Sequence, residues 1–222
     1  MFTKEIELIG LENFTKLQEK SVLIVGIGGV GGTTLEVLIR SGIKNITLID
    51  YDTFDITNLN RQILATTKDI NKKKVDVALN RSLEINKDIN IKVKHLYLNK
   101  DNVKEIGMYD YIIDTCDTVT VKVELIRYAK VNNIKIISCM GTGKRIDPTK
   151  LFIGTLNKTY NDPLAKVMRK CVKEFCPKLN IPVVASSEIP LNNNVSIGSL
   201  MQVTSTAGIY IASFIINDII KE

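Results

Sequence analysis

The residues that could do chemistry begin with a glycine-rich turn, Gly26-Ile-Gly-Gly-Val-Gly31. The apolar run Val22–Val25 precedes it, so a short strand should enter a turn that opens a helix. Glycines 26, 28 and 31 fit G-x-G-x-x-G, in which the first allows a tight turn, the second admits a phosphate and the third lets helix and strand pack closely. The N–H groups at the start of the helix form an anion site. This motif predicts nucleotide binding but leaves the nucleotide open.

An acidic residue follows at the distance that a ribose contact requires. Asp50 lies 19 residues after Gly31, at the end of an expected second strand. A carboxylate at that place accepts hydrogen bonds from a ribose hydroxyl. NAD and ATP share this feature, so both remain open at this point.

Two cations downstream favour ATP. Arg61 lies in Asn58-Leu-Asn-Arg-Gln62, just after the second strand, and an arginine there can bind phosphate oxygens in a bidentate fork. Lys74 can add a second charge, although it ends the run Lys72-Lys73-Lys74, in which a solvated lysine is the simpler interpretation. Displacement at phosphorus needs such cations, whereas hydride transfer does not.

Asp117 completes the set of candidate residues. In Asp114-Thr-Cys-Asp117 it precedes an expected helix, where it could cap that helix or bind Mg²⁺ beside the phosphates. The sequence contains no Walker A pattern, which excludes a typical P-loop NTPase.

Alternating strands and helices must position these residues. We expect helices at 2–20, 29–41, 71–86 and 118–132, and strands at 22–25, 46–49, 91–96, 111–113 and 135–139. This alternation predicts an α/β fold, a Rossmann-like, doubly wound and mostly parallel sheet. Ligands bind at the carboxyl ends of such strands. Those ends carry Gly26, Asp50 with Asp52, Asp114 with Asp117, and the loop 141–143.

The 222 residues suit a single domain, with N-terminal helices at 1–20, a nucleotide-binding core at 21–140 and a basic extension at 141–222. In the extension we expect strands at 151–156 and 183–185, a basic helix at 164–175 and a long apolar helix at 200–217. No sharp linker separates the extension from the core.

The net charge of +6 is concentrated in the extension. Residues 144–178 contain nine Lys or Arg and three acidic residues, so the rest of the chain is neutral. Such a local excess fits a polyanion such as nucleic acid, or equally a solvated helix face.

The remaining composition indicates a cytoplasmic protein without zinc. The four cysteines, at 116, 139, 171 and 176, are accompanied by a single histidine, His95, so we expect free thiols and no zinc site. The N-terminus lacks the signal-peptide pattern. The apolar stretch 209–220 is interrupted by polar residues and is too short to span a bilayer, which predicts no membrane association.

In combination, these motifs resemble the adenylating enzymes related to ubiquitin activation, in order and spacing over residues 21–140. The resemblance implies an E1-like fold, ATP and Mg²⁺ as cofactors, and attack of a substrate carboxylate on the α-phosphate to give an acyl-adenylate. It implies catalytic roles for Arg61, Lys74 and Asp117, with Asp117 on Mg²⁺. The implied ATP-binding residues are Gly26, Gly28, Gly29, Gly31, Asp50, Asp52, Asn58, Arg61, Gln62 and Lys74.

The extension resembles one branch of these enzymes, the tRNA threonylcarbamoyladenosine dehydratases, at Gly143-Lys-Arg-Ile-Asp-Pro-Thr149, Asp162-Pro-Leu-Ala-Lys166 and Ser186-Ser-Glu188. This resemblance implies a homodimer that cyclises threonylcarbamoyladenosine in tRNA, with a sulfur-relay or cysteine desulfurase protein as a further partner. The implied tRNA contacts are Lys144, Arg145, Lys166, Arg169, Lys170 and Lys173.

Three alternative functions make different demands on these residues. An adenylyltransferase for a ubiquitin-like sulfur-carrier protein would use the same ATP site. Arg61 and Asp117 disfavour an NAD(P) dehydrogenase, and a tRNA-binding structural protein would need neither residue. Two departures from the family stand out. Only Lys4 is near the position of its usual N-terminal arginine, and the stretch 175–186 is short.

Overall fold

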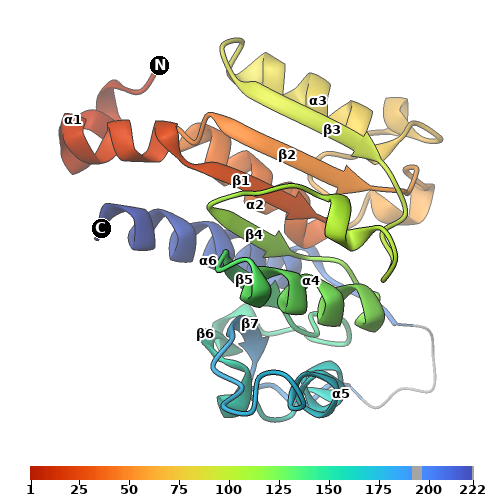
Figure 1. Cartoon of the computed structure of the whole chain (residues 1–222). Coiled ribbons are helices and arrows are strands. Elements are labelled where there is room, and N and C mark those ends of the chain that lie inside the picture. Colours follow the sequence, from red (N-terminus) through yellow and green to blue (C-terminus); the bar gives the residue numbers. More distant parts are fainter. Residues whose placement is uncertain (192–196, 222) are drawn as a thin grey trace.

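The computed structural model describes residues 1–191 and 197–221. In this part of the chain, seven strands form one sheet in the order β3-β2-β1-β4-β5-β7-β6 (Figure 1). Neighbouring strands are parallel except for β6, which runs antiparallel to β7. The predicted α/β fold with a mostly parallel, doubly wound sheet is therefore confirmed.

The elements lie within a few residues of their predicted positions. The strands are β1 (Ser21–Val25), β2 (Asn45–Asp50), β3 (Asn90–His95), β4 (Tyr111–Asp114), β5 (Lys135–Cys139), β6 (Leu151–Thr155) and β7 (Pro182–Ser186). The helices are α1 (Thr3–Glu19), α2 (Gly29–Arg40), α3 (Lys74–Ile85), α4 (Val119–Val131), α5 (Pro163–Val172) and α6 (Met201–Ile220). The expected extension at 141–222 includes residues 192–196 and 222, which lie outside the described part.

Both faces of the sheet are covered, because successive side chains of a strand point to opposite faces. In β1, Val22 and Ile24 join a core cluster with residues of α2 and α6. Leu23 and Val25 join a second cluster with residues of α4. Figure 1 shows α4 on one side of the sheet and α2 with α6 on the other. The four buried residues explain why β1 reads as a continuous apolar run.

Two helices differ from their predicted outlines. The helix α1 is interrupted at Gly10, whose φ of 82° and ψ of 156° are not helical. The helix α3 begins at Lys74 and not at Asn71, because residues 71–73 pair with the loop after β2. In that loop, Phe54 N–H donates to Lys72 O at 2.9 Å and Asn71 N–H donates to Phe54 O at 2.8 Å. This pairing fixes where Lys74 enters its helix.

The helix α6 corrects one argument from the sequence. With 20 residues it is longer than the interrupted apolar stretch 209–220, and its length and composition would allow it to cross a bilayer. A core helix of a soluble protein can have the same properties. One side of α6 packs on α2, and Val203, Ala207 and Ile211 have no exposed surface.

Candidate functional site

A cavity of about 450 Å³ opens at the carboxyl ends of the parallel strands. It lies where the strand order reverses between β1 and β4, which is the usual ligand crevice of such sheets. The cavity is lined by every predicted nucleotide-site residue except Gly31, namely Gly26, Gly28, Gly29, Asp50, Asp52, Asn58, Arg61, Gln62, Lys74 and Asp117.

The glycine turn is shaped by close backbone approach. Gly26 has a φ of +91°, a conformation that glycine adopts without strain, and its N–H donates to Ile49 O at 2.9 Å. A Cβ at Gly31 would lie 1.9 Å from Gly26 O, so any side chain there would force the helix away from the strand. Gly31 therefore acts through packing, as the motif predicts, and does not line the cavity.

Asp50 is held by the backbone at the end of β2. Its Oδ2 accepts from Ile27 N–H at 2.5 Å and its Oδ1 accepts from Asp52 N–H at 2.7 Å. Burial raises the pKa of Asp50, although these two N–H groups and the cation of Lys74 act in the opposite direction. The carboxylate is fixed in orientation and each oxygen retains a lone pair for a ligand hydroxyl.

Lys74 reaches the cavity from the first residue of α3. Its Nζ lies 2.8 Å from Asp52 Oδ2, and its backbone N–H donates to Asp52 O at 3.0 Å. The lysine is buried, so the solvated interpretation of this lysine is wrong. The neighbouring Lys72 and Lys73 are exposed.

Arg61 lies on a loop anchored at both ends. The short 3₁₀ turn η1 (Ile56–Asn58) begins with a capping box between Asp55 and Asn58. Arg61 is half-buried, and its Nη1 donates to Thr57 O at 2.7 Å. Thr204 of α6 donates to Arg61 O at 3.4 Å. The far end of the chain thus helps to position this loop.

Gln62 has an unused polar atom at the cavity. Its side chain is 6% exposed, and among the described residues its Oε1 has no hydrogen-bond partner. A buried unpaired carbonyl oxygen costs free energy unless a ligand or water satisfies it. This is the arrangement expected of a wall that contacts a polar ligand.

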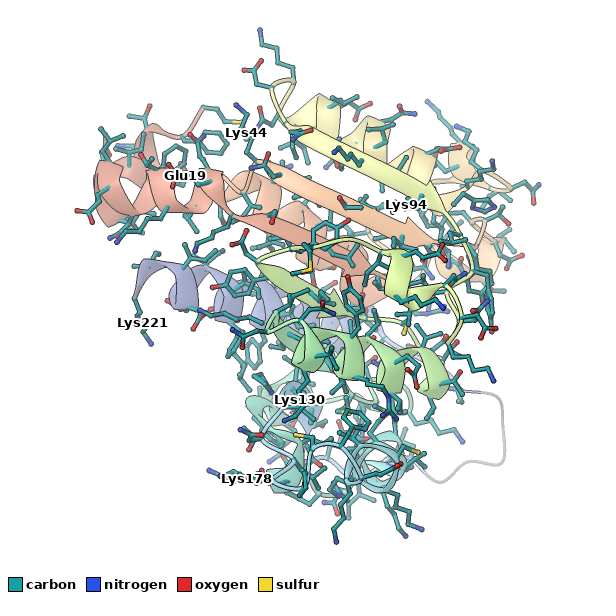
Figure 2. The ribbon with its side chains drawn as sticks, in the orientation of Figure 1. Glu19, Lys44, Lys94, Lys130, Lys178 and Lys221 are labelled. Carbon is teal, nitrogen blue, oxygen red and sulfur yellow. The ribbon has the colours of Figure 1, made fainter. Side chains whose placement is uncertain are left out.

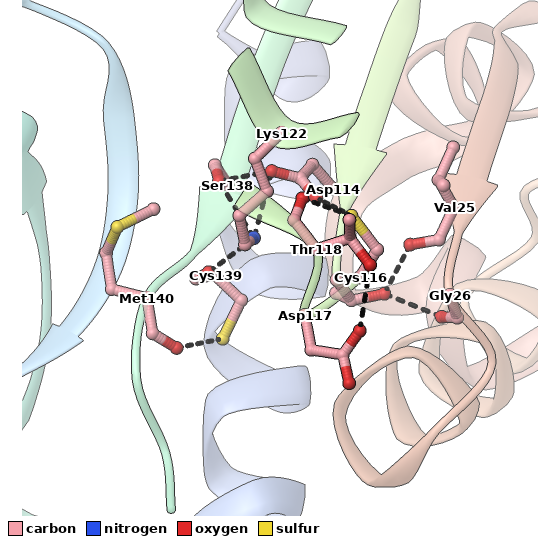
Figure 3. Close-up of polar contacts among 11 residues, drawn as sticks. Val25, Gly26, Asp114, Cys116, Asp117, Thr118, Lys122, Ser138, Cys139 and Met140 are labelled. Carbon is pink, nitrogen blue, oxygen red and sulfur yellow. Dashed lines mark hydrogen bonds and ion pairs between the residues drawn. The ribbon is translucent and has the colours of Figure 1, made fainter. Parts of the chain in front are cut away.

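Asp117 is exposed and lines the same cavity, and Figure 3 shows its carboxylate beside Thr118. The N-cap of α4 is Thr118, whose hydroxyl donates to Asp117 Oδ1 at 3.3 Å, so the capping interpretation of Asp117 is wrong. Within residues 1–191 and 197–221, no cluster of three or more His, Cys, Asp or Glu could hold a metal ion. A cation at Asp117 would therefore need additional oxygen ligands from a bound phosphate or water.

Asp114, predicted to share this edge, is turned away from the cavity. Its carboxylate is fully buried and pairs with Lys122, at 3.0 Å between Oδ2 and Nζ. Burial is the largest single effect on the pKa of Lys122 and would lower it, but the charge and hydrogen bond of Asp114, together with smaller contributions from Cys116 and Cys139, outweigh burial and raise the pKa. Sequence reasoning missed Lys122, because eight residues separate the partners and nothing local marks the lysine as buried.

An aromatic pair was also missed. Tyr51 and Tyr97 both line the cavity, with ring centroids 4.8 Å apart and planes at 78°. They follow the ends of β2 and β3, neighbouring strands whose carboxyl ends meet at this edge. The signal was available, because each tyrosine lies one or two residues beyond its strand.

Only some of the predicted tRNA-contacting lysines and arginines of the basic extension are exposed. Lys166 and Lys170 are exposed on α5 and Lys173 is exposed at its C-cap, at a spacing that places all three on one face. Figure 2 shows the nearby Lys178 at the outer surface of this region. Arg169 is half-buried and donates to Thr159 O at 2.9 Å.

The other two predicted contacts precede β6. Lys144 is half-buried, whereas Arg145 is only 2% exposed, with Nη2 donating to Asn161 O at 2.8 Å. The prediction that Arg145 contacts tRNA at the surface is therefore wrong, since its charge faces the protein interior. Burial lowers its pKa, against the attraction of Asp162 and Glu188.

The four cysteines are free. Cys139 and Cys176 are buried, Cys116 is intermediate and Cys171 is exposed. Burial raises the pKa of Cys139 to about 12 and that of Cys116 well above its ordinary value. Neither of these two thiols is activated for chemistry.

Comparison with known proteins gives the class. The ThiF family profile matches residues 2–221, and the chain belongs to this family. A tRNA threonylcarbamoyladenosine dehydratase of Bacillus subtilis (strain 168) is 34% identical over 192 residues, covering 86% of this chain and 76% of the relative. A molybdopterin-synthase adenylyltransferase of Haemophilus influenzae is 33% identical over 172 residues, covering 76% and 68%.

A solved structure resembles the chain over nearly its whole length. The E. coli tRNA N6-threonylcarbamoyladenosine dehydratase TcdA in complex with ATP has a TM-score of 0.94 and 33% identity, covering 99% of this chain and 93% of that one. The same E. coli protein in complex with AMP has a TM-score of 0.93. The predicted resemblance to this group is confirmed.

Proposed function

We propose that the chain uses ATP to dehydrate and cyclise threonylcarbamoyladenosine in tRNA, through an adenylated carboxylate. The observation that carries the proposal is the meeting of Asp50, Arg61, Lys74 and Asp117 around one cavity. The similarity to a dehydratase seen with both ATP and AMP supports it, since ATP is the nucleotide consumed in the first proposed step and AMP is the nucleotide released in the second.

The proposed adenylation step follows from the charges around the cavity. The glycine turn and the start of α2 receive the phosphates, and Asp50 accepts from the ribose. Arg61 and Lys74 stabilise the negative charge that develops on the phosphate oxygens. A substrate carboxylate oxygen bonds to the α-phosphorus while the bond to pyrophosphate breaks. The nucleoside now carries an acyl-adenylate.

The second step closes the ring. An atom of the carbamoyl group attacks the activated carbonyl carbon, the carbon–oxygen bond to AMP breaks and a proton is released. The nucleoside loses one water in total, and the oxygen of that water leaves on AMP. A carboxylate labelled with heavy oxygen would therefore transfer the label to AMP, which distinguishes adenylation from phosphorylation by ATP.

The residues present fit Mg²⁺, which we propose as the second cofactor. Asp117 would hold the ion together with phosphate oxygens and water, in the octahedral oxygen environment that Mg²⁺ prefers. The ion would neutralise charge on the phosphates during displacement. Asp117 precedes the N-cap position of α4, which Thr118 occupies, and the Asp117 side chain is exposed, so its carboxylate is available for this role.

The exposed lysines of α5 support tRNA as the substrate. Asp162, the N-cap of α5, accepts from Gly141 N–H at 2.9 Å, and the adjacent Thr142 lines the cavity. Lys166, Lys170 and Lys173 thus continue from the wall of the site along one helix. We propose that they contact the tRNA backbone together with Lys144 and Arg169.

We further propose that the enzyme is a cytoplasmic homodimer that does not associate with membranes. Leu8 and Leu11 of α1 are 84% and 65% exposed, and Ile209 of α6 is 47% exposed. Such apolar side chains on contacting helices support a self-complementary interface. Sedimentation equilibrium would test this, because a Leu8→Glu/Leu11→Glu variant should remain monomeric. A sulfur-relay or cysteine desulfurase partner remains a prediction to which we assign no surface.

The test of function is incubation with ATP and tRNA carrying threonylcarbamoyladenosine. We expect AMP, pyrophosphate and loss of one water mass from the nucleoside by mass spectrometry. The alternative function is activation of a sulfur-carrier protein, and the similarity to an adenylyltransferase makes it the second candidate. It would win if a carrier protein ending in a free carboxylate stimulated pyrophosphate exchange and this tRNA did not.

A further inference from the structure

A buried polar cluster lies next to the loop that carries Asp117 (Figure 3). Lys122 and Asp114 at its centre have no exposed surface. The lysine Nζ donates to Asp114 Oδ2 at 3.0 Å, to Ser138 Oγ at 3.3 Å and to Cys139 O at 2.8 Å. An ammonium has three N–H donors, so every donor of Lys122 has an acceptor.

The cluster joins three elements at the edge of the cavity. Asp114 ends β4, Lys122 lies in the first turns of α4, and Ser138 lies near the end of β5. The hydroxyl of Ser138 donates to Asp114 Oδ2 at 2.5 Å. These contacts fix the end of β4 relative to α4, and the loop 115–118 spans the interval between them.

Asp117 is bracketed by residues attached to this cluster. On one side, Cys116 Sγ lies 3.1 Å from Asp114 Oδ1. On the other, Thr118 O accepts from the backbone N–H of Lys122 at 3.0 Å. The carboxylate of Asp117 itself projects into the cavity, away from the cluster.

Stability alone does not account for a buried ion pair. The desolvation of two charges offsets much of their attraction, and apolar residues of similar volume are often as stable or more so. An ion pair with fully satisfied hydrogen bonds does provide directionality, which apolar packing lacks. The ligand-bearing loop above it is the feature that such directionality would serve.

We propose that Lys122 is a positioning residue, which through Asp114 and Ser138 holds the loop 115–118 so that Asp117 faces the phosphates. The inference rests on the proposed function, in which Asp117 binds Mg²⁺. Lys122 contacts neither nucleotide nor metal. Its effect should appear as coupling between Mg²⁺ and ATP binding, and less in the affinity for ATP alone.

The test compares ATP affinity with Mg²⁺ and with EDTA by calorimetry. The wild-type protein should bind ATP more tightly with Mg²⁺. The Lys122→Met/Asp114→Leu variant removes both charges and leaves none unpaired, so it should fold. In this variant, we expect the increase in ATP affinity that Mg²⁺ produces to be smaller by about tenfold or more, as for other residues that support a metal ligand. Its affinity for ATP in EDTA should change by less than about threefold.

Ser138→Ala provides a graded second variant that keeps the ion pair. It should also reduce the increase in ATP affinity that Mg²⁺ produces, by a smaller factor than the double variant does. If the double variant does not fold, the result for Ser138→Ala decides the test. A wild-type gain from Mg²⁺ in a folded double variant, or in Ser138→Ala when the double variant is unfolded, would overturn the inference.

Different results would refute the proposed function and the positioning role of Lys122. A wild-type protein whose ATP affinity does not respond to Mg²⁺ would refute the metal role of Asp117, and with it the positioning role of Lys122. A wild-type protein that shows the response but does not form AMP with the modified tRNA would refute the substrate alone. The calorimetric comparison would then still decide the role of Lys122.

Discussion

Lys74 and Asp52 form an unequal ion pair, in which the lysine side chain is 6% exposed and the aspartate side chain 46% exposed. The distance between Nζ and Oδ2 is 2.8 Å. The carboxylate can turn toward solvent, whereas the ammonium is held in the wall of the cavity. An incoming phosphate could therefore take over the lysine, because the competing carboxylate has water available as an alternative.

The first prediction concerns this lysine. Lys74→Met keeps most of the side-chain volume and removes the charge, so kcat/KM for ATP should fall by about 10²–10³-fold. The matched control is Lys73→Met, whose exposed side chain should matter by no more than about twofold. The measurement is AMP formation at varied ATP. Equal effects at positions 73 and 74 would mean that Lys74 acts only through general surface charge.

The second prediction concerns the two walls of the cavity. Arg61→Ala and Asp117→Ala should each abolish AMP formation, because one removes charge stabilisation and the other the proposed Mg²⁺ ligand. Both side chains are at least partly exposed, so the fold should persist, with circular dichroism and thermal midpoint close to wild type. Turnover near the wild-type rate in either folded variant would refute that residue's role.

The candidate nucleotide site was predictable because its signals are local. A strand, a glycine turn and a helix follow one another around Gly26, and Asp50 ends the next strand. The parallel sheet then brings strand ends together without further information, which is why Asp117 reaches the same cavity. Lys74 was ambiguous in the sequence, because its burial depends on the pairing of residues 71–73 with the loop after β2.

The interior contacts were not predictable from the same patterns. Lys122 is buried because Asp114 and Ser138, from two other elements, supply its acceptors. Arg145 follows Lys144, whose φ of 57° turns the chain, and the guanidinium then reaches Asn161 O. Charge counts treat both cations as surface residues, since the count contains no tertiary contacts.

The third prediction concerns the lysine face of α5. Reversing charge at Lys166, Lys170 and Lys173 with glutamate should weaken tRNA binding by about tenfold or more, and should make the salt dependence of log K shallower by about 0.9 for each lost phosphate contact. The control makes the same three changes at exposed lysines elsewhere, Lys87, Lys100 and Lys104. Filter binding across a salt series measures both quantities. An equal loss in the control variant would assign the effect to net charge alone.

The fourth prediction concerns thiol reactivity. Cys171 is exposed, whereas Cys139 and Cys176 are buried and the pKa of Cys116 is raised by burial. At mildly alkaline pH a thiol reagent should therefore modify one cysteine rapidly in the native protein and all four after denaturation. Mass spectrometry of the labelled peptides identifies the site, and Cys171→Ser should remove the rapid phase. Rapid labelling of Cys116 would contradict the packing around β4.

The last prediction is a pH dependence of stability. Glu36 of α2 accepts from Arg81 and Arg40, at 2.9 Å and 2.6 Å from its Oε1. Burial would raise the pKa of Glu36, but the two arginines outweigh it and hold the pKa below its ordinary value of 4.5. A carboxyl group with a depressed pKa stabilises the folded state above its unfolded pKa and loses that contribution as the pH falls through its folded pKa.

Glu36→Gln should therefore lower the free energy of unfolding by about 1 kcal/mol at neutral pH, a modest value because both arginines are about half exposed. The difference from wild type should shrink at acidic pH, below the ordinary glutamate pKa of 4.5, because protonation then removes the ionised carboxylate that the arginines stabilise. Urea unfolding at the two pH values measures it. The control Glu84→Gln, at a carboxylate 71% exposed and 3.9 Å from Arg81, should change stability little at either pH. A Glu36→Gln difference that grows as the pH falls would show that the arginines do not stabilise the ionised carboxylate.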